Sequence, residues 1–128
     1  WRDVSAALDA LADSPGDPCD DVVLHYADPV TGGPTLLTID CELQRLRPRF
    51  KGRGKRHTHA VIYHVLEGSG RTQVGDDKFD WKEGDTFVVP LWTWHAHQNA
   101  SSTPATLFSI TDKPVMQALG FDRQELER

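Results

Sequence analysis

Apolar and β-branched residues recur in short runs along most of the chain, and Gly, Pro, Asp or Asn follows most of these runs. This pattern is typical of strands joined by tight turns. The predicted strands are residues 22–26, 35–46, 60–66, 71–74, 78–81, 86–89, 92–97 and 105–111. Short strands with turns at intervals of about eight to twelve residues favour an all-β barrel or jelly roll. No helical crossover segments separate the strands, so a parallel α/β sheet is not expected.

Two short helices are expected to flank the barrel. Val4, Leu8 and Leu11 recur at helical spacing near the start of the chain. Near the end, Gly120 stops a second short apolar segment. The predicted organisation is one domain over residues 1–128, with a helix at 4–11, the barrel at about 22–111 and a helix at 115–119.

Composition narrows the classes of partner. The formal net charge of −5 at pH 7 does not suit a nucleic-acid-binding surface, nor attraction to an anionic membrane surface. No apolar run approaches the ~18 residues that a membrane span requires, and no signal peptide is visible. Cys19 and Cys41 have neither zinc-site nor redox spacing. We therefore expect free thiols and a cytoplasmic protein.

Four of the six histidines form two pairs, His57 with His59 and His95 with His97. Residues two apart on a strand point to the same face, so each pair can direct both rings to the barrel interior. Imidazole clusters of this kind bind Fe, Zn, Cu, Ni or Mn. The alternative is that the paired histidines lie at the surface or hydrogen-bond to each other.

Residues 47–56 are rich in basic side chains, with four Arg and two Lys in ten positions. One interpretation is a solvated flexible loop. The other is an entry loop that attracts an organic acid or a partner.

The spacing of Gly84, Pro90, His95 and Asn99 resembles the second sequence motif of cupins, and residues 57–68 resemble the first. More specifically, the chain resembles the C-terminal cupin of the gentisate, salicylate and 1-hydroxy-2-naphthoate dioxygenases, which are bicupins. The segments that carry this resemblance are 28–34, 56–58, 62–68, 79–81, 87–90, 92–95 and 107–120. The resemblance implies an all-β cupin fold, a double-stranded β-helix or jelly-roll barrel.

The resemblance also implies a function, that of an Fe(II)-dependent ring-cleaving dioxygenase. Its substrates would be a small aromatic hydroxy acid and O₂, and the bond between the carboxyl-bearing and hydroxyl-bearing carbons would break. His57 and His95 match metal ligands of the family, and His59 is the candidate third ligand. His97 and Gln44 match residues near the substrate. A homo-oligomer or a second cupin domain is the expected partner.

Two departures from the family pattern lead to a second hypothesis. Lys55 stands where the family has its first histidine ligand, and a protonated lysine is a poor ligand at neutral pH. Tyr63 stands where the catalytic cupin has an arginine that grips the substrate carboxylate. The second hypothesis is therefore a degenerate, metal-free cupin that supports oligomerisation or a catalytic partner cupin. A third is a cupin that binds a sugar or small acid through residues 51–56.

Overall fold

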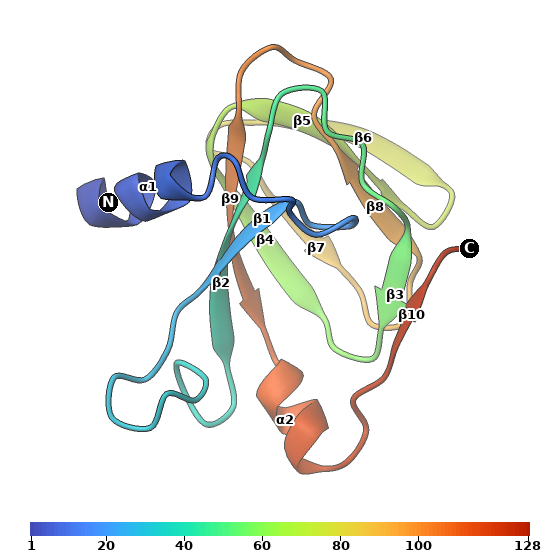
Figure 1. Ribbon diagram of the computed structural model, residues 1–128. Helices are drawn as coiled ribbons and strands as arrows, with labels where there is room; N and C mark the ends of the chain where they lie inside the picture. The colour runs from blue at the N-terminus through green and yellow to red at the C-terminus, as the bar shows by residue number, and fades with distance from the viewer.

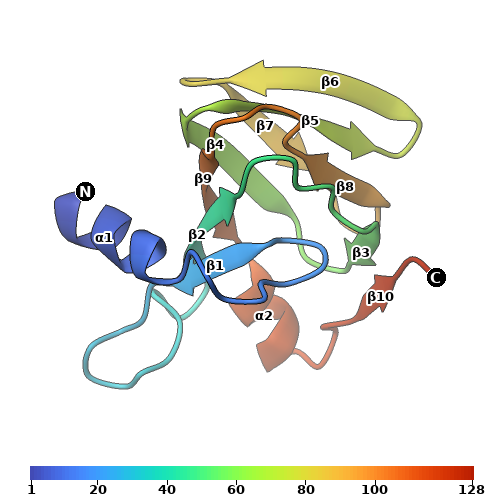
Figure 2. The same ribbon diagram turned by 45° about the horizontal axis from the view of Figure 1, so that its top comes forward.

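Two five-stranded antiparallel sheets make up most of the chain, and they face each other in Figures 1 and 2. The structure, a computed structural model, describes residues 1–128. The strands are β1 (Val22–His25), β2 (Asp40–Leu46), β3 (Lys55–His57), β4 (Val61–Glu67), β5 (Ser69–Val74), β6 (Asp77–Lys82), β7 (Thr86–Val89), β8 (His95–Gln98), β9 (Ala105–Thr111) and β10 (Gln124–Leu126). The sheet orders are β1-β2-β9-β4-β7 and β10-β3-β8-β5-β6. The prediction of an all-β jelly roll is confirmed.

The main core lies between the two sheets. Inward and outward side chains alternate along each strand, so one apolar face of each sheet meets the other. Its eight buried members are Leu46, Val61, Tyr63, Val65, Trp81, Val89, Ala105 and Leu107. These side chains fill part of the interior between the sheets, and a polar cavity occupies another part.

Helix α1 (Arg2–Ala10) covers part of the outer face of the first sheet (Figure 1). Leu8 is 1% exposed and packs against Val22 and Leu43, which makes a second, smaller core. The helix starts and ends slightly before the predicted range of 4–11. Leu11 lies just beyond it as the C-cap residue, yet still packs on the same cluster.

Several predicted bounds were wrong, each for a local reason. The strand predicted at 35–46 begins only at Asp40, because the Leu36 amide bonds to the Ile39 carbonyl and turns the chain away from the sheet. The strand predicted at 92–97 begins at His95, since Trp92 has a positive φ of 53°. Helix α2 (Lys113–Ala118) starts earlier than the predicted 115, with Pro114 in its first turn.

The turn after β8 is fixed by Asn99, the last residue of the second motif. Its side chain is fully buried. The amide nitrogen donates to the carbonyl oxygens of Leu46 and Thr103 at 3.0 and 2.8 Å. The amide oxygen accepts bonds from the backbone and hydroxyl of Ser101. The asparagine therefore ties the loop between β8 and β9 to the end of β2.

Gly70 on β5 is a position where packing excludes a side chain. A Cβ there would meet the buried ring of Trp81 and lie 2.6 Å from the carbonyl oxygen of Gln98. Gly70→Ala is expected to lower the free energy of unfolding by about 1–3 kcal/mol through overpacking, measured by urea unfolding. Gly33→Ala is the matched control, because its Cβ would meet only the Thr31 hydroxyl at 3.3 Å. Equal losses in the two variants would contradict the packing argument.

The helices α1 and α2 are too short to cross a membrane, and no helix of the structure has the length and apolarity of a span. Cys19 and Cys41 are free thiols, as the sequence predicts.

Candidate functional site

A polar cavity of about 480 Å³ opens at one end of the barrel. Its wall includes Glu42 and Gln44 from β2 and Lys55 and His57 from β3. The loop before β1 closes one side of it and contributes Asp20. Charged side chains therefore surround a space that is large enough for a small organic molecule.

Three positions on the inner face of the second sheet lie close together, and two of them, Lys55 and His57, line this cavity. Lys55 and His57 are two apart on β3 and both are buried. Lys55 lies directly opposite His95 in the antiparallel pairing of β3 with β8. The ring centroids of His57 and His95 are 4.9 Å apart, at 71° to each other. One lysine and two imidazoles thus share this face.

The Nδ1 atoms of His57 and His95 both face backbone carbonyl oxygens. His57 Nδ1 donates to the His59 carbonyl at 2.7 Å, and His95 Nδ1 donates to the Thr93 carbonyl at 3.0 Å. A carbonyl only accepts, so Nδ1 carries the proton and Nε2 has the free lone pair. The Nε2 atom of His95 is buried and has no hydrogen-bond partner. Such carbonyl-oriented imidazoles are typical of metal ligands.

Burial keeps both rings neutral. It is the largest cause of the lowered pKa of His57, and it lowers the pKa of His95 to about 4. The nearby Lys55 charge acts in the same direction on both groups. Two neutral imidazoles are therefore available on this face at pH 7.

His59, the candidate third ligand, lies beside His57 but faces it as a stacked ring. The two centroids are 3.8 Å apart and the ring planes differ by only 3°. A metal ion binds an imidazole nitrogen in the plane of the ring, and two parallel stacked planes share no such point. Burial, followed by repulsion from His57, lowers the pKa of His59 to about 4. The structure brings His59 close without directing it to the same ion.

Position 55, the third of the inner positions, carries a charged ammonium group instead of a nitrogen lone pair. The Lys55 Nζ atom forms an ion pair with Asp20 Oδ2, and the two side chains are only 11% and 20% exposed. Gln44 Nε2 donates to the other Asp20 oxygen at 3.4 Å. Since an ammonium has no lone pair, the residues present do not fit a three-imidazole metal site.

Of the two residues that the resemblance placed near a substrate, only Gln44 lines the cavity. His97 is 1% exposed and packs in the core, with its ring centroid 4.8 Å from that of Tyr63. Its Nδ1 lies 2.9 Å from the Thr72 hydroxyl, and burial holds its pKa well below the usual range. The structure therefore places His97 behind the cavity wall.

Asp20 is the site residue that sequence reasoning missed. It lies in a loop of Asp, Pro and Gly residues, and no spacing separates it from Asp17 or Asp21. One signal was available: a lysine at an inward position is commonly paired with a counter-ion. The sequence could thus predict a buried carboxylate here, but could not identify which one.

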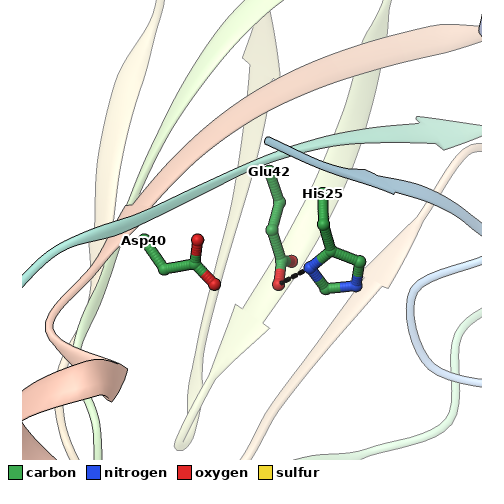
Figure 3. Close-up of side chains that lie close together, drawn as sticks. All are labelled: His25, Asp40 and Glu42. Carbon is green, nitrogen blue, oxygen red and sulfur yellow. Dashed lines mark ion pairs between the residues drawn. The ribbon is translucent and has the colours of Figure 1, made fainter. Parts of the chain in front are cut away.

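A second group of polar side chains lies at the rim of the cavity. His25 on β1 and Glu42 on β2 are directly paired in register, and Asp40 is two residues before Glu42 (Figure 3). His25 Nδ1 lies 3.0 Å from Glu42 Oε1. Burial raises the pKa of Glu42, and His25 opposes this shift. The ligand atoms of the three residues lie within 4.8 Å of one another, and they make this rim acidic.

The basic segment 47–56 is held by internal contacts. Arg47 bonds to both Asp21 oxygens and to the carbonyls of residues 12, 14 and 15. Arg53 bonds to the Glu127 carbonyl, and Arg56 pairs with Glu125 of β10 at 2.6 Å. These three arginines hold the N-terminal loop and the C-terminal strand against the barrel, which favours a structural role for them.

Comparison with known proteins identifies the class of this barrel. Residues 42–111 match the family described as "Cupin domain". The chain belongs to the cupin family.

Its relatives include larger enzymes. It is 46% identical over 127 residues to a 5-aminosalicylate 1,2-dioxygenase of Comamonas sp, covering 98% of this chain and 34% of the relative. It is 40% identical over 128 residues to a 1-hydroxy-2-naphthoate 1,2-dioxygenase of Nocardioides sp. (strain KP7), covering 99% and 33%. The crystal structure of salicylate 1,2-dioxygenase from Pseudoaminobacter salicylatoxidans with gentisate superimposes with a TM-score of 0.89 at 30% identity, covering 99% and 36%. The chain thus spans about a third of each relative.

Proposed function

We propose that this chain is the cupin part of a ring-cleaving dioxygenase that acts on hydroxylated aromatic acids. The observation that carries the proposal is the match to such enzymes along 98–99% of the chain at 40–46% identity. That match includes the flanking helices and β10 as well as the barrel, and the structural likeness has the same extent. A barrel shared with unrelated cupins would not by itself suggest this activity.

Within that enzyme, the role that the site supports is a metal-free cupin beside a catalytic partner cupin. Lys55 and the stacked His59 leave only two imidazoles, His57 and His95, as candidate ligands on the inner face. The cavity wall also carries more carboxylates than cations, with Asp17, Asp20 and Glu42 against Lys55 and Lys113, while Asp21 is neutralised by Arg47. Such a wall repels an aromatic carboxylate.

Tyr63 supports the same role. Its side chain is buried on the cavity wall, and burial raises the pKa of its hydroxyl well above the usual range. A neutral phenol offers no charge to a carboxylate. The iron chemistry is therefore assigned to the partner domain. In this chain, Gln44 is a polar residue of the cavity wall and His97 is a packing residue.

Assembly with a second cupin domain or a second copy belongs to the same proposal. Ile62, Val88 and Ile110 are neighbours in register on β4, β7 and β9. They are 45%, 52% and 37% exposed on the outer face of the first sheet. This β-branched surface is available for such a partner.

The test is oxygen uptake, after anaerobic loading with Fe(II), by the protein that contains both this chain and the catalytic partner cupin. Gentisate, 5-aminosalicylate and 1-hydroxy-2-naphthoate are supplied in turn, and mass spectrometry checks that the product gains both atoms of O₂. Catechol, which lacks the carboxyl group, is the control substrate and should give no uptake. Absence of uptake with all three acids by the iron-loaded protein would refute the proposed activity.

A further inference from the structure

We infer that the Lys55–Asp20 ion pair fills the position of a metal ion in this barrel, and that a histidine at position 55 would complete a metal site there. The inference concerns this barrel's own residues and does not depend on the proposed dioxygenase activity.

The first support is the shared orientation of three backbone positions. Lys55, His57 and His95 all face the interior, and their exposed fractions are 8%, 2% and 2%. Position 55 lies opposite His95 across the β3–β8 pairing, so a side chain there projects alongside the His95 ring. Lys55 lines the cavity, whereas His95 does not. Of this directly paired couple, only the lysine reaches the cavity.

The second support is the unused lone pair. His95 Nε2 and His97 Nε2 are both buried without a hydrogen-bond partner, and such atoms in a native protein call for an explanation. Of these two histidines, only His95 is paired directly opposite position 55. The carbonyl bonds of His57 and His95 fix both rings in the tautomer that a metal requires. His57 and His95 thus remain oriented as metal ligands, while position 55 holds the lysine cation.

The third support is the charge of the ion pair. A metal ion would bring positive charge to this point, and the Lys55 ammonium supplies positive charge instead. Asp20 neutralises it from the loop before β1, and Gln44 holds the second carboxylate oxygen. A divalent cation arriving here would meet a like charge with no lone pair to offer.

Lys55→His would remove the positive charge and add a ligand in a single substitution. The ammonium is removed, and an imidazole joins His57 and His95 on the same face. The Asp20 carboxylate loses its partner and becomes available as an oxygen ligand. Three imidazoles with one carboxylate suit Co(II), Zn(II) and Fe(II).

The experiment measures Co(II) binding to the full-length protein by elemental analysis and by visible absorption of the bound ion. Lys55→His should bind about one Co(II) per chain more than the wild type, with new absorption bands from imidazole-bound cobalt. Lys55→Met is the matched control, which removes the charge without adding a ligand and should gain none. Any Co(II) at His25, Asp40 and Glu42 is common to all three proteins and cancels.

Wild-type protein gives an independent test in case the variant fails to fold. His95→Ala should leave the wild-type metal content unchanged, whereas it should abolish the extra Co(II) of Lys55→His. Loss of metal from the wild type on His95→Ala would overturn the inference. So would a Lys55→His variant with wild-type circular dichroism and no added Co(II). An equal gain in Lys55→Met would overturn the claim that position 55 is a ligand position.

Discussion

Asp20→Asn should lower the free energy of unfolding by about 3–5 kcal/mol, because it leaves the Lys55 ammonium buried without a counter-ion. The two side chains are 11% and 20% exposed, so water can compensate little of the lost charge. Asparagine keeps the shape of the side chain and can still accept the Gln44 hydrogen bond. Urea unfolding at neutral pH, with an unchanged m-value, measures the loss.

Two further variants separate charge from general disturbance. Asp80→Asn breaks the Arg71–Asp80 pair, whose side chains are 55% and 71% exposed, and should cost far less because solvent screens surface pairs. Asp20→Leu combined with Lys55→Met removes both charges and should recover most of the stability. An Asp20→Asn protein as stable as Asp80→Asn would show that the pair is not a buried charge in solution.

The backbone of the barrel was largely predictable because strand and turn signals are local. The predicted strands 86–89 and 105–111 have the same bounds in the structure. β10 was missed, since three residues with one apolar side chain give no period to detect. It forms through distant contacts, namely pairing with β3 and the ion pair of Arg56 with Glu125.

The candidate site was predictable only in its residue types. The pattern of His57, His59, His95 and His97 indicated a histidine-rich interior, and all four are buried. Their directions were not predictable from a spacing of two, because the chain leaves β3 after His57 and bends. His59 therefore returns over His57 as a stacked ring.

The departure from the family pattern at Lys55 was more informative about the site than the residues that match the pattern. A lysine at an inward strand position requires a counter-ion, a shifted pKa or an exit to solvent. The structure has the first of these, from a loop that is 35 residues earlier in the chain. Only the tertiary fold brings these two residues together. The sequence therefore indicated that Lys55 needs a counter-ion, but it could not identify Asp20 as that counter-ion.

The stability of the protein should fall steeply as the pH is lowered from 7 to 5. The pKa values of His59 and His95 are about 4 in the folded protein, against an ordinary value of 6.5, with burial as the main cause. Between those values the unfolded chain binds protons that the folded chain excludes. Their stabilising contribution is complete above about pH 6.5 and is lost as the pH falls towards 4. Each histidine should account for about 2 kcal/mol between pH 7 and pH 5.

The measurement is urea unfolding at half-unit steps across this range, which lies above the pH at which most carboxylates begin to titrate. His95→Gln removes one of these buried imidazoles and should reduce the loss between pH 7 and pH 5 by about 2 kcal/mol, because glutamine takes up no proton. Its stability at pH 5 should therefore approach that of the wild type, even if it is lower at pH 7. A wild-type protein with equal stability at both pH values would mean that these rings are solvated in solution, and the closed packing of His57, His59 and His95 would have to be abandoned.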